Sequence, residues 1–512
     1  MKLSDPEPVN AIKKIKLRIK IKLPFRRIAA FTFLFLITGT NFLQAQNATS
    51  SPYSRFGIGD LNSITFAANL GIGGTEIGLY QPLQINYGNP AANSGLLFTT
   101  YDGGIDFKQY EFKTSKTQHR TNTASVSYFD FAFPINRQKW SLGFGLLPYS
   151  KVGYLVTSES TNTFGDKERS QYTGSGGLNN FHISTGFKVS KKLSFGLNSE
   201  YLFGVLNNDR TVGYSSGYYY STSIKSNTSV GWFHFNAGAQ VKFDSLALAK
   251  SDSIIFFEKK ISTLQLELKN LLLTSDTSRE IYSKKNQLVQ EIATNKLLKE
   301  NVFTRRKKTD WRLVLGIVAS PSTDLHARNS ILVNSFRYTF FGTPQELIFT
   351  RDTILQINGV RSFVRLPLKT GFGFSLQKGS RWLFCSDFIF QQWSKFSFLG
   401  AKDSLVDSWK ISAGIQLTPN DRVLKPYWKK LQYRLGFHYD SGYLKFNGTN
   451  ISEAGVSAGL GIPVKRAGTM LNLAFEAGRN GTTENNLILE RYFKITLGFT
   501  INDLWFIKAK YD

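Results

Sequence analysis

Segments of strand length in which every second residue is apolar recur along most of this chain. The clearest is 232–243, and segments 409–417 and 493–501 alternate in the same way. A repeat of two is that of an extended strand, whose side chains point to opposite faces in turn. In water such strands half-bury in a sandwich, whereas in a membrane the apolar face meets lipid and the polar face lines a lumen. The alternation therefore indicates an all-β fold, either a sandwich or a barrel.

The connections between the expected strands favour the barrel, because short basic turns alternate with longer polar segments. The short turns are 136–139, 190–192, 378–381 and 465–468, and the longer segments lie around 157–176, 207–226 and 335–362. Bacterial outer-membrane barrels have tight periplasmic turns and longer outer loops. We predict a transmembrane antiparallel β-barrel of about fourteen strands, an even number that returns the C-terminus to the periplasm. Strand boundaries within 321–365 stay open.

The N-terminal segment 1–45 has the layout of an export signal. Eight basic residues between Lys13 and Arg27 precede the apolar run 28–37, and Ala45 ends a stretch with small-residue cleavage geometry. At helical rise, ten apolar residues span only about 15 Å, which is too short for a bilayer core. We predict a Sec-type signal peptide and a location in the outer membrane of a Gram-negative bacterium.

The composition agrees with a barrel and excludes other classes. Phe, Tyr and Gly number 43, 22 and 43, a balance that suits sheets with aromatic girdles. The formal charge of +27 lies partly in 1–45 and is otherwise dispersed, so we expect no nucleic-acid binding. The single cysteine, Cys385, excludes an intrachain disulfide and a cysteine-based metal site, and we expect a buried or lumenal thiol.

One region, 246–308, departs from the strand pattern. Apolar residues recur there at helical spacing, in two runs: Phe257, Ile261, Leu264, Leu268 and Leu271, then Ile281, Leu288 and Ile292. Each stripe needs a partner, so we predict a helical hairpin. By strand parity the hairpin replaces a periplasmic turn. Either its helices pack only on each other, or they dock a periplasmic protein.

No pattern in the chain indicates enzyme chemistry, a metal site or a cofactor. The five histidines, His119, His182, His234, His326 and His438, lie outside the H-E-x-x-H, C-x-x-C and G-x-S-x-G motifs. Strand parity instead predicts polar side chains that face the lumen: Lys188, Glu200, His234, Gln240, Lys242, Arg434, His438, Asp440 and Glu476. Burying a charge unpaired is costly. If these groups form ion pairs with one another, they would rigidify a closed lumen. If they are unpaired and hydrated, they would line a solute path.

Both ends of the exported chain resemble a known family. The segments 51–61, 73–74 and 85–91 (Ile-Asn-Tyr-Gly-Asn-Pro-Ala) resemble Bacteroidetes outer-membrane proteins related to the FadL long-chain fatty acid transporters. The ending 492–499, followed by 504–508, is similar to the same group. The resemblance implies a fourteen-stranded barrel whose N-terminal residues form a hatch inside the lumen. It also implies import of hydrophobic solutes, with lateral exit through a kink or gap in the wall. The helical insert departs from the family's general pattern.

We therefore divide the chain into a signal peptide (1–45), a hatch or plug (46–96), a first barrel half (97–245), a helical hairpin (246–308) and a second barrel half (309–512). The expected function is passive uptake of hydrophobic small molecules through a FadL-like channel, gated by hatch residues Arg55, Phe56, Gly57, Asn89, Pro90 and Ala91. The expected partners are outer-membrane lipid and a hydrophobic ligand such as a fatty acid, with the barrel a monomer. The alternative is a structural or secretion-accessory barrel that docks a periplasmic partner through 246–308.

Overall fold

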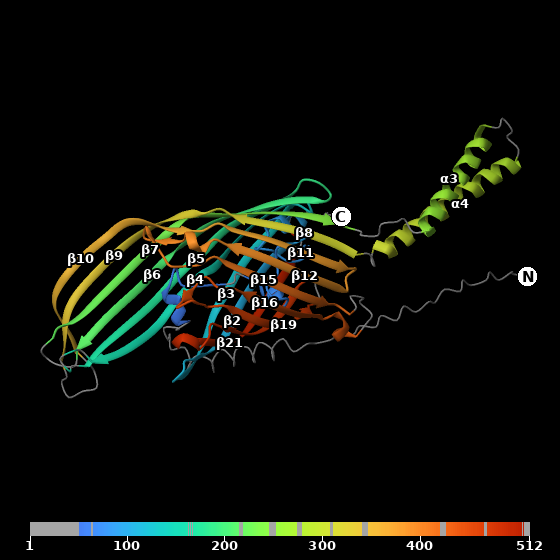
Figure 1. Cartoon of the computed structure of the whole chain (residues 1–512). Helices are drawn as coiled ribbons and strands as arrows, with labels where there is room; N and C mark the ends of the chain where they lie inside the picture. The colour runs from blue at the N-terminus through green and yellow to red at the C-terminus, as the bar shows by residue number, and fades with distance from the viewer. Residues whose placement is uncertain are drawn as a thin grey trace, which may run out of the picture. The chain divides into compact units, whose positions relative to one another are not determined.

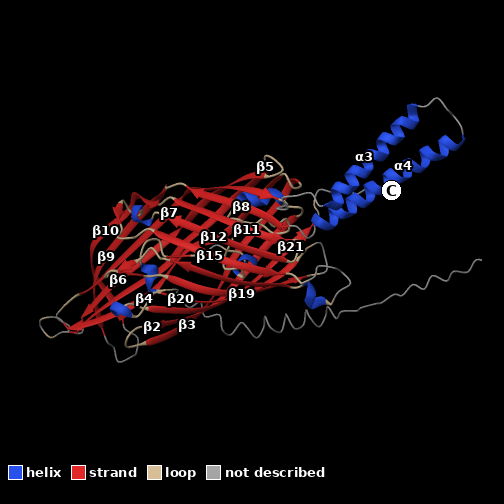
Figure 2. Ribbon diagram, turned by 45° about the vertical axis from the view of Figure 1, so that its right-hand side comes forward, coloured by secondary structure: helices blue, strands red, loops and turns tan. Residues whose placement is uncertain are grey.

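The computed structural model describes residues 51–62, 65–161, 163, 165, 167–214, 219–244, 252–273, 279–307, 311–339, 347–419, 426–464, 468–503 and 505. The predicted signal peptide lies outside these residues. Most of the described chain is β-strand, and the strands lie edge to edge around a lumen (Figures 1 and 2).

Fourteen of the described strands close into an antiparallel ring, which confirms the predicted barrel. The first and last ring strands pair from Thr99 with Asp503 to Lys113 with Leu489. We call the end of the ring at Thr99 and Asp503 the near end, and the opposite end the far end. The ring strands are β2 (Thr99–Lys113), β3 (Gln118–Asn136), β4 (Trp140–Thr161), β5 (Lys167–Lys188), β6 (Leu193–Tyr214), β7 (Ser221–Phe243), β8 (Trp311–Ser320), β11 (Lys369–Lys378), β12 (Trp382–Gln391), β15 (Ser408–Leu417), β16 (Gln432–Asp440), β19 (Glu453–Pro463), β20 (Met470–Asn480) and β21 (Leu489–Asp503).

The region whose strand boundaries stayed open forms an extension of two ring strands. β8 continues after Pro321 into β9 (Thr323–Thr339), and β10 (Leu347–Leu366) continues after Pro367 into β11. β8 pairs with the near half of β7, and β9 pairs with its far half. Proline cannot donate to a ladder, so each strand is interrupted where its proline lies.

The wall is much taller on one side than on the other. β4, β5 and β6 have 22 residues each and β7 has 23, whereas β12 and β15 have 10 each and β16 has 9. The prediction of long loops at 157–176, 207–226 and 335–362 is therefore wrong, because most of these residues extend the β4–β5, β6–β7 and β9–β10 hairpins. Where a hairpin projects beyond the apolar belt, both of its faces are polar. The alternation then disappears from the sequence while the backbone ladder continues.

Side chains alternate between the two faces of the wall as a membrane barrel requires. On β6, Phe195, Tyr201 and Val205 are exposed, whereas the intervening Asn198 and Glu200 are buried. An apolar outer face with a polar inner face is the reverse of a water-soluble sandwich. The structure thus decides between the two folds that the alternation allowed.

The described residues 51–62 and 65–98, which we call the hatch, lie inside the ring (blue in Figure 1). Its regular elements are η2 (Pro52–Arg55), β1 (Asp60–Leu61), α2 (Ala67–Leu70) and η3 (Pro90–Gly95). The remaining short elements of the described chain are η4 (Trp393–Lys395), β13 (Ser397–Phe398), β14 (Ala401–Lys402), η5 (Tyr427–Lys430), β17 (Lys445–Phe446), β18 (Thr449–Asn450) and η6 (Glu484–Asn486).

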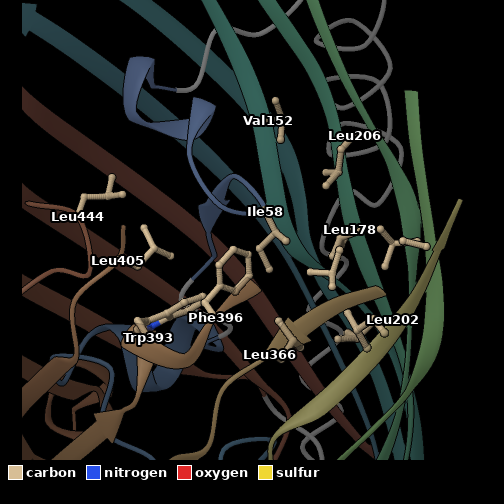
Figure 3. Packing of buried hydrophobic residues seen from close by; sticks show 14 of the residues in the cluster. Ile58, Val152, Leu178, Leu202, Leu206, Leu366, Trp393, Phe396, Leu405 and Leu444 are labelled. Atoms are coloured by element: carbon tan, nitrogen blue, oxygen red, sulfur yellow. The ribbon is translucent and has the colours of Figure 1, made fainter. Parts of the chain in front are cut away.

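A packed apolar cluster joins the hatch to the wall and to the segment that follows β12 (Figure 3). Ile58 of the hatch meets Leu178 and Leu202 of the wall, and Trp393 and Phe396 enter from η4 and its C-terminal flank. All five side chains are at most 1 % exposed. Fully burying such a side chain stabilises the packed state by roughly 1.5–3 kcal/mol.

Nine strands also present inward-facing glycines on which the hatch rests. A Cβ placed on any of them would lie 2.8 Å or less from a hatch atom, so any larger residue would displace the hatch. We call this set the glycine girdle: Gly186, Gly196, Gly238, Gly316, Gly373, Gly414, Gly436, Gly459 and Gly498.

The insert forms the predicted helical hairpin, α3 (Asp252–Leu273) and α4 (Arg279–Lys307). Leu264 of α3 packs with Leu288 and Ile292 of α4, as the two stripes predicted. The ion pair between Lys260 Nζ and Glu291 Oε1, at 3.1 Å, also crosses between the helices. No helix in the described part of the chain is both long and apolar enough to cross a bilayer.

The girdle predicts which glycines tolerate a methyl group. Gly436→Ala should push the hatch backbone at Gly73 off the wall and lower the free energy of hatch opening by roughly 1–3 kcal/mol. Gly103→Ala is the matched control, because the atoms nearest to its Cβ would belong to the ring of Phe499, at 3.1 Å, and not to the hatch. Hydrogen exchange of residues 66–79 in folded, heat-modifiable protein measures the difference. Equal protection in both variants would show that the hatch does not depend on this contact.

Candidate functional site: hatch, lumen and two breaks in the wall

The six predicted hatch residues form two separate groups. In the first, the Arg55 guanidinium carbon lies 4.4 Å from the Tyr172 ring centroid, and the Phe56 ring lies 4.8 Å from that of Phe446. Gly57 has a φ of +64°, which favours glycine there. This group therefore contacts β5 and the apolar cluster around Ile58, Trp393 and Phe396, which we call the far-end apolar cluster.

The second group, Asn89 to Ala91, anchors the hatch on the glycine girdle. The buried Asn89 side chain donates from Nδ2 to the Ile77 carbonyl at 2.8 Å and accepts from Ala91 N–H at 3.2 Å, which caps η3. Pro90 follows at the first position of η3, where its missing N–H costs nothing. The structure does not bring the two groups together, and a gating role for either stays a prediction.

The nine residues predicted to face the lumen are buried or half-buried, and several contact the hatch. Gln240 Nε2 donates to the carbonyls of Ile77 and Leu79, each at 2.9 Å. Glu200 Oε1 accepts a hydrogen bond from the Tyr87 hydroxyl at 2.9 Å. These wall side chains satisfy polar groups of the buried hatch, as a filled lumen requires.

The cationic members of this set are held in different ways. The Nζ atoms of Lys188 and Lys242 lie 5.8 and 4.6 Å from the centroid of the Tyr80 ring, which belongs to the hatch. Arg434 is buried, and its guanidinium donates to the amide oxygens of Gln416 at 2.7 Å and Asn472 at 2.8 Å. Neutral oxygens therefore supply partners for a cation deep in the lumen.

Sequence reasoning missed Asp387, which binds the hatch most directly. Its Oδ2 accepts from the backbone N–H groups of Glu76 and Ile77, at 2.5 and 2.8 Å. The inward parity of β12 could have revealed it. Cys385, two residues earlier on the same face, is buried with its Sγ 3.0 Å from Thr75 Oγ1. The thiol is thus buried against the hatch, in agreement with the prediction of a buried or lumenal thiol.

His438, Glu453 and Glu476 bring their ligand atoms within 4.8 Å of one another, a spacing that a metal ion could bridge. The Tyr492 hydroxyl, however, lies among them, 2.6 Å from Glu453 Oε1 and 2.8 Å from Glu476 Oε1. The hydroxyl has one proton to donate to these carboxylates. Its oxygen lies between the three side chains, in the position that a bound cation would need. We therefore assign no metal to this cluster.

Two small cavities lie beside the hatch, with volumes of about 110 and 200 Å³. Both are lined by Leu61, Asn62 and Thr65 of the hatch, and the larger extends to Glu200 and His234 of the wall. Pockets for small-molecule ligands usually measure about 300–1,000 Å³ and are mostly apolar. These two cavities have room for water but not for a large apolar solute.

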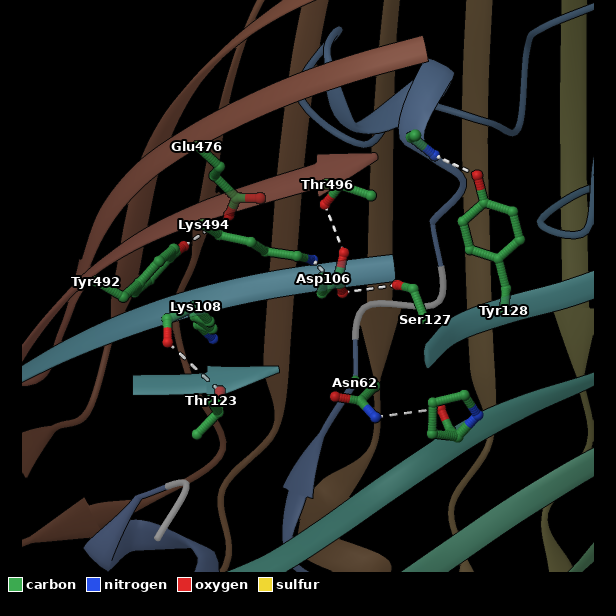
Figure 4. Close-up of polar contacts among 12 residues, drawn as sticks. Asn62, Asp106, Lys108, Thr123, Ser127, Tyr128, Glu476, Tyr492, Lys494 and Thr496 are labelled. Carbon is green, nitrogen blue, oxygen red and sulfur yellow. Dashed lines mark hydrogen bonds and ion pairs between the residues drawn. The ribbon is translucent and has the colours of Figure 1, made fainter. Parts of the chain in front are cut away.

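The first break in the wall lies between β3 and β4. Their ladder stops at Phe129 and Leu146, and beyond it β1 of the hatch pairs with β4, Asp60 opposite Lys151. Polar groups surround this break (Figure 4). Asp106 accepts from Ser127 and Thr496, each at 2.6 Å, and lies 3.3 Å from Lys494 Nζ. An apolar solute would have to pass these groups, which makes the break unsuited to it.

The second break lies between β7 and the β8–β9 junction. Residues 231–236 of β7 have no ladder partner in the described part of β8 or β9. Side chains close the gap instead: His234 Nδ1 lies 3.0 Å from Thr323 Oγ1, and Ser320 Oγ donates to Asn236 Oδ1 at 3.2 Å. Trp232 stacks on the His326 ring with centroids 3.7 Å apart. We call this junction the side-chain seam.

An outward-facing groove of about 980 Å³ lies at the seam. Its lining includes the aromatic residues Tyr201, Trp232, Phe233 and Phe363. The larger inner cavity is lined by His234, Asn236 and Ser320, which are the inner residues of the same seam. The seam therefore separates a lumenal cavity from an aromatic groove on the outer wall.

The ring, the lumenal hatch and the outward apolar face define an outer-membrane-type β-barrel of the FadL fold. A FadL homologue from Pseudomonas aeruginosa has this fold, with a TM-score of 0.51, 11% identity, and 86% of this chain and 98% of that chain covered. The toluene transporters TbuX of Ralstonia pickettii (TM-score 0.48, 12% identity, 86% and 99% covered) and TodX of Pseudomonas putida (0.47, 14%, 87% and 99%) were also found. The chain belongs to the BamG family, whose model matches residues 25–300 and 265–512. A comparison with curated proteins gave no match.

One buried carboxyl of the hatch predicts a pH dependence. Burial raises the pKa of Glu76 to about 8 from its ordinary 4.5, against a hydrogen bond from Asn69 that lowers it. The hatch favours the protonated form, so its stability is full below pH 4.5 and falls as the pH rises through 8. Hydrogen exchange of residues 66–98, corrected for intrinsic rates, should show decreasing protection over this range.

Glu76→Gln keeps the shape of the side chain and removes its titration. We expect the hatch of this variant to keep its protection across the same pH range. If wild type and variant lose protection with the same slope, another group controls the hatch.

Proposed function

We propose that this protein is an outer-membrane channel for passive entry of hydrophobic small molecules, described here in a closed state, and that solutes leave sideways through the side-chain seam. The observation that carries the proposal is the interruption at 231–236, where only side chains divide the inner cavity from the aromatic groove. Elsewhere, lateral passage would require the rupture of a continuous backbone ladder or contact with the charges at β3–β4.

Opening the seam costs little compared with breaking a ladder. Two side-chain hydrogen bonds and one ring stack hold it, and each is worth about 0.5–1.5 kcal/mol. Rotation of Trp232 away from His326 would expose the gap, and the indole is already 41% exposed. A thermally accessible side exit is therefore consistent with a wall that stays intact elsewhere.

The hatch is suited to control access to this exit. Glu76, Ile77, Tyr87 and Gly88 of the hatch line the inner cavity, so a shift of this stretch would enlarge it. We assign to Asn89, Pro90 and Ala91 the role of anchoring the hatch to the wall. We assign to Arg55, Phe56 and Gly57 the role of moving when a solute reaches the far end. In this proposal solutes enter through the far-end apolar cluster once Trp393 and Phe396 move aside.

The seam can be tested with two tryptophans of equal exposure. Trp232→Ala should raise the entry of an apolar fluorescent probe into liposomes or cells several-fold, because the ring stack that closes the gap is lost. Trp409→Ala is the control: it is also 41% exposed, but it lies on a strand with a full ladder to β12. Both variants must stay heat-modifiable. Unchanged entry with Trp232→Ala would contradict the side exit.

A second function, an accessory barrel that docks a periplasmic protein, is favoured by the hairpin. Besides the buried stripe, α4 carries a second apolar row, Tyr282, Val289 and Leu297, that is 69%, 52% and 60% exposed. The spacings of seven and eight place these residues on one helical face. An exposed apolar row on a helix is a surface on which a partner could dock.

Deletion of 246–308 discriminates between the two functions. Phe243 and Leu313 are paired, so a short loop can join β7 to β8 without disturbing the ring. If the hairpin docks a partner, the deletion should leave probe entry unchanged and abolish secretion of other proteins. The triple variant Tyr282→Ser, Val289→Ser and Leu297→Ser should have the same effect with the hairpin still folded. Normal secretion in both variants would exclude the accessory role.

A further inference from the structure

The outer groove at the seam carries a pair of arginines that the wall itself does not neutralise. Arg328 of β9 and Arg361 of β10 are directly opposite each other in the ladder, and both are exposed. Like charges in this position repel. Among the described residues neither arginine has a carboxylate partner, since the nearby Asp324 is held by Arg365 at 2.6 and 2.8 Å. The pair thus presents two guanidinium forks to which no carboxylate of the described residues is bound.

The position of the pair relative to the apolar belt suggests where that anion comes from. One rung of the sheet runs from Val205 through Ser229 to Arg328 and Arg361. Val205 is the last apolar residue on the outer face of β6, since Asn207 follows at the next outward position. The exposed aromatic residues Tyr201, Phe233 and Phe363 line the same groove as the two arginines, so the arginines form its polar edge beside the apolar belt, where lipid headgroups meet a membrane protein.

The groove continues from the arginines toward the belt with apolar walls. Two residues after Arg361 on the same face is Phe363, and two residues after Ser229 is Gly231; both line the groove. Tyr201 and Phe233 line the groove beyond them, with ring centroids 5.2 Å apart. A cationic head and an aromatic floor are complementary to a molecule with a phosphate at one end and acyl chains at the other.

We propose that this groove binds a phosphorylated membrane lipid, with its phosphate held by Arg328 and Arg361 and an acyl chain lying along Phe233 and Tyr201. Arginine suits the task because its planar fork binds phosphate bidentately. A bound phosphate would also remove the repulsion between the two side chains and join β9 to β10 at the polar edge of the groove. The site does not depend on whether solutes pass through the seam.

Native mass spectrometry of the full chain in detergent tests the proposal, with bis-phosphorylated lipid A as the probe. Arg328→Gln with Arg361→Gln should weaken retention of the lipid about tenfold or more. Arg120→Gln with Arg491→Gln is the matched control, because those exposed arginines already share Glu111, at 2.7 and 3.7 Å. Arg328→Lys with Arg361→Lys keeps the charge but loses the fork, and should give intermediate retention.

Three further measurements separate a lipid site from weaker explanations. Dephosphorylated lipid A should bind the wild type as poorly as the intact lipid binds the glutamine variant, and inorganic phosphate should not displace the lipid. The proposal is overturned if the glutamine variant retains the lipid normally, if the control loses it equally, or if the phosphate groups make no difference. Displacement by inorganic phosphate would also overturn it, in favour of a small-anion site.

Discussion

The contact between the hatch backbone and the glycine girdle is the constraint on which the rest of this structure depends. A ring of fourteen strands is too wide for its own side chains to fill. The chain fills it with a second layer of backbone, and two backbones can approach this closely only where the wall has no side chain. The peptide groups brought into the interior need partners, which Gln240, Asn89 and Asp387 supply.

The polar interior follows from the same arrangement. Because backbone groups line the hatch surface, wall residues that face it carry amides, hydroxyls and carboxylates rather than methyl groups. Arg434, held by neutral amide oxygens, and Glu476, held by the Tyr492 hydroxyl, are examples. The largest apolar cluster lies around Ile58, Trp393 and Phe396, and a smaller one joins Phe66 and Ile85 of the hatch to Leu147 of the wall. Polar contacts and apolar clusters therefore both hold the hatch in the lumen.

The sequence predicted the features that depend on local periodicity. Alternation on β6 and β7 and the stripes at Leu264 and Leu288 each reflect one element and its immediate neighbour. The prediction was wrong beyond the apolar belt, because both faces of a strand are polar there. The far-end hairpins were therefore predicted as loops. The sequence also could not pair Asp387 with Glu76, or Arg328 with Arg361, because register between strands is set by turns and bulges that leave little trace in composition. The glycines of the girdle could be seen in the sequence, but the sequence did not show that they form one surface facing the hatch.

The pairing of β2 with β21 joins residues about 400 positions apart, Thr99 with Asp503. Closing so long a loop is entropically the most expensive step in building the wall, which places it last in assembly. The hatch directly precedes β2 in the chain, so it is made first and is already tethered to one edge of the open sheet. The sheet can thus curl around its plug, with the girdle glycines as the template, and the lumen need never exist empty. The order of the elements along the chain therefore favours a folding order in which the hatch is present before the barrel closes around it.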